Sequence, residues 1–222
     1  MVFQTRMIRS VMISAGVLAL AGCMGSGGNG GNGGAGGGGA NGGNSVLDYD
    51  TAFESVQLTQ VTQTPLTGTA DYSGQVSIRT NANSNLMDER VFGDLAMSID
   101  FGAANDPITA TVNNIAGEIN GVQTSIDGEL STANANNQVN AISDTTINVP
   151  GQGSSTVTGM SVGLEGTLSD PSSTLSGEAL MTLQGNFVGN DGAAVFGASS
   201  LAVRPSSGPD VITGGTYYAE KD

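Results

Sequence analysis

Cys23 is the residue of this chain whose type and position point to a specific reaction. It is the only cysteine, and it follows Leu-Ala-Gly at the end of the apolar run 11–21, which two arginines precede. A positive start, a short apolar core and small residues are typical of a signal peptide. Leu-Ala-Gly-Cys resembles the bacterial lipobox, in which the cysteine becomes the first mature residue and receives acyl chains. We predict lipidation at Cys23; a cleavable signal with an incidental cysteine, or a buried apolar helix, is the alternative.

The residue types that most catalytic and metal sites need are scarce. The chain has no histidine, which excludes His-based acid–base catalysis, triads that contain histidine and His/Cys zinc sites. Lys221, the only lysine, lies one residue from the end, and no Ser-x-x-Lys motif occurs. We therefore predict a protein that is not an enzyme and has no cofactor and no metal site.

Carboxylates and tyrosines are the remaining candidates for chemistry. Asp48 with Asp50, and Asp127 with Glu129, lie two residues apart, so on an extended segment each pair shares a face and could hold a cation weakly. A solvated acidic surface is the interpretation that we prefer. Phenolate oxygen can ligate ferric iron, but we expect barrel packing or surface positions for the four tyrosines, which are Tyr49, Tyr72, Tyr217 and Tyr218.

Charge and composition limit the partners and the fold. The formal net charge is −14, with only six Lys and Arg, so we expect no binding of nucleic acid or of an anionic membrane face by charge. The chain is rich in glycine (35 residues) and only 12% of its residues are charged. Together with many Thr, Ser, Asn and Val residues, this composition favours short strands and turns over helices.

The amino-terminal region divides into a signal peptide, residues 1–22, and a lipidated linker, residues 23–45. From Met24 to Ser45 the chain is almost entirely Gly, Asn, Ala and Ser, which bury too little apolar area to offset the entropy of ordering. A flexible coil of this length spans about 25 Å. Because Met24, not Asp, follows Cys23, the mature protein resembles lipoproteins released for transport to the outer membrane. We predict a flexible disordered tether that holds a folded domain clear of the lipid.

Residues 46–66 are interpreted as a lead-in segment to the folded domain. Thr51 and Glu54 have the spacing of a helix capping box, and apolar residues lie nearby. A single helical turn and an irregular segment are both compatible with this short, Thr- and Gln-rich stretch.

From residue 67 to 222 apolar and polar residues alternate, as in strands with one buried face. The clearest signal is Asn120-Gly121, the favoured pair for a type I′ hairpin turn. That turn pairs Ile115 with Ile126 and Ile119 with Val122 on one face. The remaining strands are predicted within 67–79, 91–101, 108–112, 145–149, 160–168, 175–187 and 195–203.

Eight or nine consecutive antiparallel strands with one apolar face predict a closed barrel or a sandwich. Sequential hairpins favour a single eight-stranded up-and-down β-barrel, all-β in class, whose interior side chains fill. Inward glycines such as Gly93, Gly117, Gly177 and Gly185 would allow close packing. A membrane-spanning barrel is disfavoured, because aromatic residues are only 5% and such barrels carry aromatic girdles.

Three stretches resemble bacterial surface lipoproteins that carry a transferrin-binding protein B-like β-barrel. Residues 64–74 are similar to the family's Pro-x-x-Gly-x-Ala-x-Tyr-x-Gly strand, Asp100-Phe101 to its Asp-Phe step, and 185–197 to its Gly-x-Phe-Tyr-Gly turn and following strand. The resemblance implies a non-catalytic binding lipoprotein at the surface or facing the periplasm. No binding residues are carried over from it, and the chain has room for one barrel only.

These observations predict a lipoprotein of the outer membrane, anchored to the membrane through Cys23, whose barrel binds a protein or small ligand such as an iron carrier. The binding loops are expected at the barrel rim, within 81–90, 134–140 and 206–215. The alternative is a structural envelope lipoprotein without a dedicated ligand. The sequence does not identify the ligand or the oligomeric state.

Overall fold

The computed structural model describes residues 46–80, 89–136, 138–149, 153–171 and 175–222. The predicted signal peptide, the predicted tether and Cys23 lie outside the described residues. The described elements, in chain order, are α1 (Val46–Gln57), β1 (Thr69–Arg79), β2 (Arg90–Asp100), β3 (Ile108–Ile119), β4 (Val122–Ser131), β5 (Asn140–Val149), β6 (Gly153–Ser169), β7 (Gly177–Val188), β8 (Ala194–Arg204) and β9 (Val211–Lys221).

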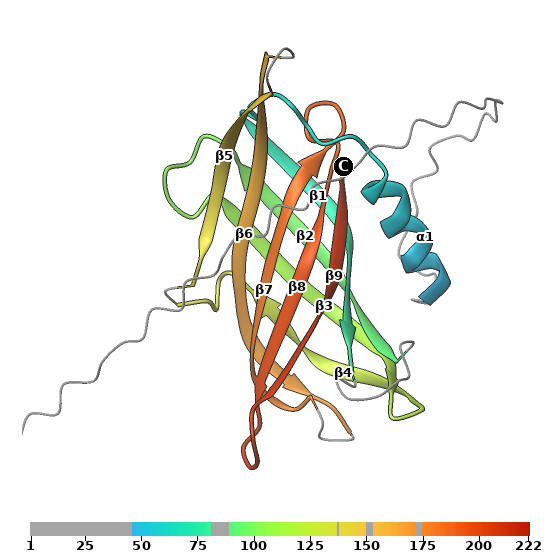
Figure 1. The fold of residues 1–222 in the computed structure, drawn as a ribbon. Coiled ribbons are helices and arrows are strands. Elements are labelled where there is room, and N and C mark those ends of the chain that lie inside the picture. The colour runs from blue at the N-terminus through green and yellow to red at the C-terminus, as the bar shows by residue number, and fades with distance from the viewer. Residues whose placement is uncertain (1–45, 81–88, 137, 150–152, 172–174) are drawn as a thin grey trace, which may run out of the picture. The chain divides into compact units, whose positions relative to one another are not determined.

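Eight of these strands close into an antiparallel barrel (Figure 1). Neighbours follow the order β4-β3-β2-β1-β9-β8-β7-β6, and pairing of β4 with β6 completes the ring. Consecutive strands are neighbours except at β5, which pairs with β6 outside the ring. The predicted eight-stranded up-and-down barrel is confirmed, and β5 is an additional strand.

The seam of the barrel lies where β4 and β5 share one edge of β6. β4 pairs with the second half of β6, whereas β5 pairs with the first half. Past the end of β4, two side chains bridge to β3. The N–H of Ala110 donates to Oγ1 of Thr132 at 3.1 Å, and the side-chain amide of Asn140 bonds both the N–H and the C=O of Ile108, at 3.0 and 2.7 Å. Barrel closure therefore depends on polar side chains as well as on strand pairing.

Alternate side chains of the barrel strands point inward and fill the lumen with one apolar core. Met97, Met160 and Met181 are buried in it. The predicted packed interior is thereby confirmed. The largest fully buried side chains of this core are Tyr72, Tyr217, Phe187, Leu95, Ile99, Ile108, Ile119, Leu130, Leu164 and Leu168.

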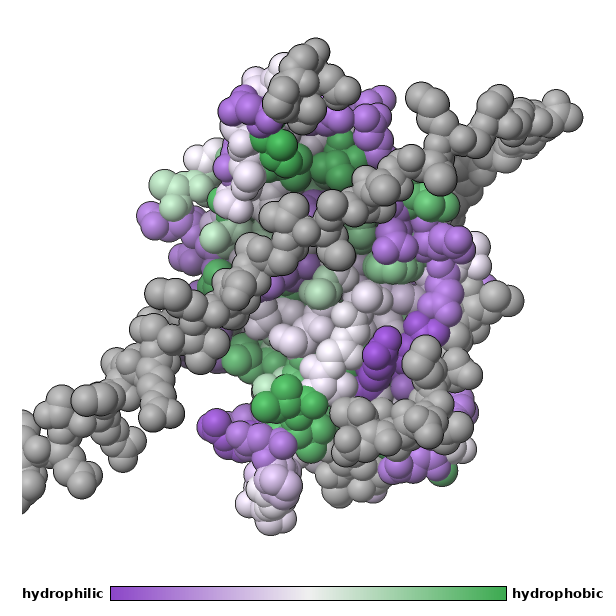
Figure 2. Space-filling model, viewed as in Figure 1, coloured by the Kyte–Doolittle hydropathy of each residue, from purple (hydrophilic) through white to green (hydrophobic). Residues whose placement is uncertain are grey.

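The outward-facing register is polar along much of the wall, as at Asp71, Ser73 and Ser98, which are exposed. Figure 2 shows a face on which apolar residues form small, separate groups among polar and small residues. Within the described part of the chain, no helix has the length and hydropathy that crossing a membrane requires.

The Asn120-Gly121 hairpin has the predicted register. Ile115 pairs with Ile126, and Ile119 with Val122. Asn120 and Gly121 both have positive φ, 52° and 77°, which a type I′ turn requires. Val122 is 62% exposed, however, although its partner Ile119 is buried in the core.

One strand prediction and one loop prediction were wrong at their boundaries. Residues 108–112 and 115–119 form one strand, β3, because a bulge between Val112 and Ile115 absorbs the change of phase. Residues 206–215, predicted as a rim loop, are in part strand, since β9 begins at Val211 and closes the barrel between β8 and β1. The glycines and threonines at the start of β9 obscure its alternation.

The lead-in segment contains a helix of 12 residues, α1, longer than the single turn considered above. Thr51 and Glu54 both lie inside α1, so they do not form a capping box at its start. The helix packs on the outside of the barrel (Figure 1), against an aromatic cluster centred on Tyr49, Phe92 and Tyr218. Tertiary packing on these rings stabilises a helix that is weak by its own sequence.

Tyr217 provides a test of the lumen packing. Its side chain is fully buried, and its hydroxyl has no hydrogen-bond partner among the described residues. We expect Tyr217→Phe to stabilise the domain by about 1–3 kcal/mol, because it removes a buried polar group that makes no bond. Tyr72→Phe is the matched control. The Tyr72 hydroxyl donates to the carbonyl of Gly192 at 2.8 Å, so its removal is expected to destabilise by about 1 kcal/mol.

The same pair of variants tests the pH dependence. Burial raises the pKa of Tyr217 above 10 and that of Tyr72 to about 12. From pH 10 up to these raised pKa values, a tyrosine loses its proton in the unfolded chain but keeps it in the folded chain. The free energy of unfolding therefore falls as pH rises above about 10, by about 1.4 kcal/mol per pH unit for each such tyrosine. Urea unfolding at pH 8 and pH 11 measures this slope. An equal slope in wild type and Tyr217→Phe would contradict burial of the phenol.

Candidate functional site

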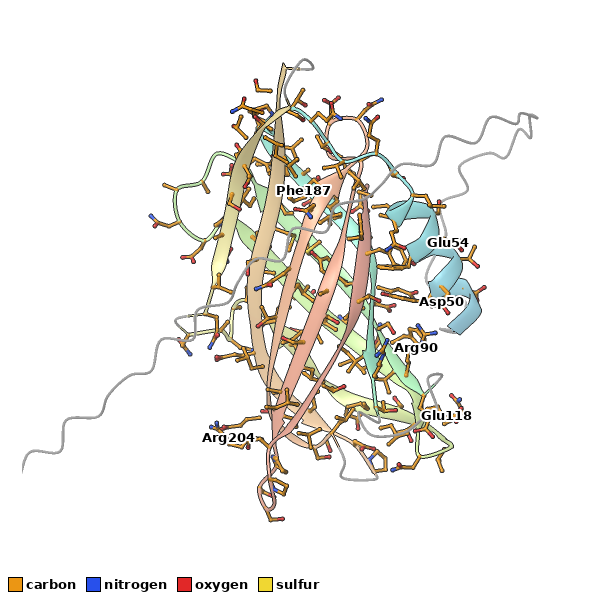
Figure 3. All side chains as sticks on the ribbon, in the orientation of Figure 1. Asp50, Glu54, Arg90, Glu118, Phe187 and Arg204 are labelled. Carbon is orange, nitrogen blue, oxygen red and sulfur yellow. The ribbon has the colours of Figure 1, made fainter. Side chains whose placement is uncertain are left out.

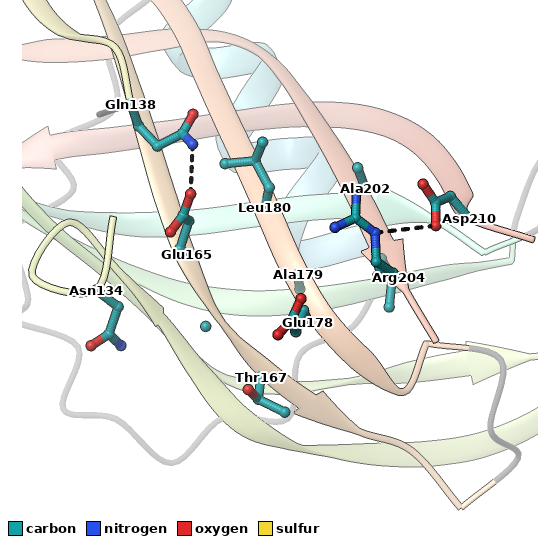
Figure 4. Close-up of a pocket in the computed structure, with 12 residues that line it drawn as sticks. Asn134, Gln138, Glu165, Thr167, Glu178, Ala179, Leu180, Ala202, Arg204 and Asp210 are labelled. Carbon is teal, nitrogen blue, oxygen red and sulfur yellow. Dashed lines mark hydrogen bonds and ion pairs between the residues drawn. The ribbon is translucent and has the colours of Figure 1, made fainter. Parts of the chain in front are cut away.

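A groove on the outer wall of the barrel is the candidate site that the structure offers (Figure 4). It has a volume of about 690 Å³, within the range of about 300–1,000 Å³ that is usual for ligand sites. We call it the outer groove. It lies on β6, β7 and β8 beside the β4–β5 connection, and it is lined by Asn134, Gln138, Glu165, Gly166, Thr167, Glu178, Ala179, Leu180, Ala202, Val203, Arg204 and Asp210.

The floor of the outer groove is built from outward positions of three paired strands. Glu165 pairs with Leu180, and Leu180 with Ala202, which forms one row across β6, β7 and β8. In the next row Glu178 of β7 pairs with Arg204 of β8. The register therefore places an apolar centre, Leu180 and Ala202, between acidic side chains and one guanidinium.

Hydrogen bonds hold Glu165 in place. Its Oε1 accepts from Nε2 of Gln138 at 2.5 Å, and its Oε2 accepts from the N–H of Asn136 at 3.4 Å. Both donors come from the β4–β5 connection, so this carboxylate fastens the connection to the barrel wall. On the opposite side, Nε of Arg204 lies 3.6 Å from Oδ1 of Asp210, and both side chains are exposed (71% and 52%). An exposed pair of this kind is weak, so Arg204 is available to a ligand.

The α1 helix covers a second part of the wall. Its Tyr49 packs on Phe92 and Tyr218, and we call these three residues the α1 cluster. The Tyr49 ring lies 5.3 Å from Phe92 and 5.5 Å from Tyr218, centroid to centroid. Asp50 accepts two hydrogen bonds from Arg90, each 2.8 Å long (Figure 3). Apolar surface that the barrel alone would expose is thus covered by the chain itself.

The predicted tyrosine positions are confirmed as packing positions. Tyr72 and Tyr217 lie in the lumen, and Tyr49 and Tyr218 lie in the α1 cluster. Burial raises the pKa of all four hydroxyl groups, and this disfavours the phenolate that binding of ferric iron requires.

The two carboxylate pairs lie in elements of different kinds. Asp127 and Glu129 are exposed on β4, which agrees with a solvated acidic face. Asp48 and Asp50 do not share a face, because they lie two residues apart in a helix and not in an extended segment. Among the described residues, no group of three or more Asp, Glu, His or Cys side chains is placed to hold a metal ion.

Residues 159–163 read Gly-x-Ser-x-Gly, a sequence found at the nucleophile elbow of some hydrolases. That elbow is a sharp turn between a strand and a helix. Here the five residues lie inside β6, and Oγ of Ser161 accepts from Nε2 of Gln184 on the neighbouring strand at 3.5 Å. The motif therefore lacks the geometry of a nucleophile elbow.

The predicted binding loops have different outcomes. Residues 134–140 adjoin the outer groove and also a second cavity, of about 500 Å³, beside the start of β5. Most of 81–90 lies outside the described residues, and its last residue, Arg90, binds Asp50 instead of facing a free rim. Cys23, the predicted lipidation site, also lies outside the described residues.

Sequence reasoning missed Glu165, Glu178 and Arg204. They lie far apart in the chain, and only the strand register brings them together. In the sequence each of them occupies a polar position of an alternating strand. This position does not distinguish them from any other exposed residue.

Comparison with known protein families gives no matching family model, and comparison with curated proteins gives no match.

Proposed function

We propose that this chain is a lipid-anchored, non-enzymatic protein of the bacterial outer membrane whose β-barrel binds a protein or small ligand. The lipobox-like sequence at Cys23 and the Gly-rich segment after it support the anchor. The lack of histidine, and a single lysine near the chain end, support a binding function without catalysis.

The filled lumen is the observation that carries the binding proposal. The side chains of Tyr72, Phe187 and Tyr217 fill the interior and are at most 1% exposed to solvent, so a ligand has no room inside the barrel. A closed barrel with a filled interior must bind on its outer wall or at its rim. The outer groove, the larger of the two cavities beside the β4–β5 connection, combines sufficient volume with polar groups on neighbouring strands and on that connection.

The charges of the outer groove favour a ligand with positive groups and an apolar part. Glu165, Glu178 and Asp210 outnumber Arg204, and the floor between them is formed by Leu180 and Ala202. Cationic groups would approach the carboxylates, and an apolar part would cover the floor. Basic protein segments have this chemistry, whereas nucleic acids, with their phosphates, do not.

A matched pair of substitutions on β8 tests the site. Ala202→Arg places a long side chain in the outer groove, and Ala198→Arg places the same side chain on an exposed outward position of the same strand, outside the groove. Residues 46–222 belong to one compact unit, so they can be purified as a domain. That domain is titrated with haem, with iron carriers and with envelope proteins captured from the producing cell.

We expect saturable binding by wild type and Ala198→Arg, and at least a tenfold weaker affinity in Ala202→Arg, equivalent to about 1.4 kcal/mol. Binding that Ala202→Arg leaves unchanged would place the site elsewhere. Repeated failure to bind any of these ligands would favour a structural envelope lipoprotein. Substrate turnover by the domain would contradict the non-enzymatic proposal.

A further inference from the structure

We propose that the free edge of β5 is the surface through which two copies of this chain associate. The proposal is independent of any ligand at the outer groove. Among the described residues, β5 pairs with β6 alone and lies outside the closed ring (Figure 1). Residues 153–158 of β6 pair with β5 but not with β7, whose pairing with β6 begins at Gly159. We call this two-stranded extension, residues 140–149 and 153–158, the β5–β6 wing.

The backbone of β5 presents the groups that another strand requires. In an antiparallel pair every second residue directs its N–H and C=O toward the partner, and the residues between direct theirs away. Alternate residues of the ten in β5 therefore point their hydrogen-bonding groups away from β6, toward the free edge. Asn140 bonds Ile108 of β3 at the base of β5, and the edge is free only beyond that point.

The side chains of β5 do not protect this edge. Natural edge strands are commonly blunted with lysine, proline, charges or bulges. β5 contains no lysine and no proline, and its single charged residue is Asp144. It pairs with β6 in continuous register without a bulge, and residues 143–148 are all exposed. Ile147 is 48% exposed and Val139, just before the strand, is 44% exposed. A long, regular and partly apolar edge of this kind is a template for strand addition.

The charge distribution favours a second copy as the occupant. All twenty Asp and Glu, but only four of the six Lys and Arg, follow Cys23, so most faces of two copies repel each other. Residues 139–163 contain a single charged side chain, Asp144, whose Oδ1 accepts from the hydroxyl of Thr158 at 2.6 Å. The wing is thus a nearly neutral surface on a strongly acidic protein, so it repels a second copy least and offers a basic partner little attraction.

Two-fold symmetry restricts the register of the pair. An antiparallel pair of identical edges has its axis perpendicular to the sheet, and like faces then meet. Pairing Asp144 with its own copy would oppose like charges across the strands, which is destabilising. The axis is therefore placed next to Thr145 or Thr146, in the middle of β5.

Sedimentation of the 46–222 domain tests the proposal. We expect a reversible dimer whose dissociation constant rises at least tenfold in Thr145→Asp/Ile147→Asp, because both positions are exposed on one face of β5 and bring like charges together at the new interface. Gln123→Asp/Ser125→Asp adds the same charge at exposed positions of β4 and is expected to leave the dimer unchanged. Circular dichroism verifies that each variant is folded.

Disulfide formation gives a second, independent readout. The domain contains no cysteine, and a residue on the axis faces its own copy at a separation that suits a disulfide. With oxidised glutathione as the electron acceptor, Thr145→Cys or Thr146→Cys is expected to form the covalent dimer at least tenfold faster than Ser125→Cys. A domain that remains monomeric at about 1 mM, a dimer that the β5 variant leaves unchanged, or equal disulfide rates would each overturn the proposal.

Discussion

Replacing Gly197 with valine is expected to destabilise the closed barrel strongly. Gly197 of β8 pairs with Gly185 of β7 on one side and with Tyr217 of β9 on the other. A Cβ atom at Gly197 would meet the carbonyl oxygen of Gln184 and the Cα of Gly185, which are backbone atoms that cannot move without shifting β7. Two facing glycines thus allow the strands to approach and give the ring of Tyr217 its place.

We expect Gly197→Val to cost about 3 kcal/mol or more, the upper part of the range for overpacked cores. Small domains have only about 5–15 kcal/mol of stability, so a loss of this size leaves much of the protein unfolded in mild denaturant. Ala198→Val, at the next residue and on the exposed side of β8, is the control, with an expected change within about 0.5 kcal/mol. Urea unfolding compares the two variants. A Gly197→Val domain as stable as wild type would mean that β7 and β8 do not approach as closely as described.

Replacing Cys23 with serine is expected to release the protein from the membrane. Each buried CH₂ of an acyl chain contributes about 0.8 kcal/mol; one chain binds marginally, and two or three together bind almost permanently. Outward positions of the described barrel wall such as Asp71, Ser73 and Ser98 are polar and exposed, so we expect the wall to contribute little to membrane attachment.

The measurement is incorporation of a palmitate analogue, followed by separation of soluble and membrane fractions. Wild type is expected in the outer-membrane fraction with label, and Cys23→Ser without label in the soluble or periplasmic fraction. The unfolding curve of the folded domain serves as the control, since it is expected to be the same in both. Equal labelling of the two proteins would contradict the proposal that Cys23 carries the lipid anchor.

The sequence predicted those parts of the fold in which local signals agree. The hairpin at Asn120-Gly121 is the clearest, because the turn pair and the alternation independently gave the same register, and both were correct. The alternation in β7 likewise predicted which side chains face the lumen. Fold class and the filled interior follow from such period-two patterns.

The sequence failed where a long-range contact overrides the local pattern. α1 is stabilised by rings of β2 and β9, which no local rule connects to residues 46–57. β9 begins with a weakly alternating stretch, and it becomes a strand because β8 and β1 hold it on both sides. The separation of β5 from β4 depends on Thr132 and Asn140 bridging to β3. The outer groove combines three strands, so its residues could be recognised only after the strands were paired.

The central claim is that the folded domain remains in water and meets the membrane only through acyl chains on Cys23. Flotation with vesicles of outer-membrane phospholipid tests this claim most directly, with the purified 46–222 domain compared with the lipidated full chain. The account predicts that the lipidated chain rises with the vesicles and that the domain stays at the bottom of the gradient. The domain is expected to be folded there, with the pKa values of its buried tyrosines still raised. Flotation of the 46–222 domain with the vesicles, or its insertion into them, would contradict the account.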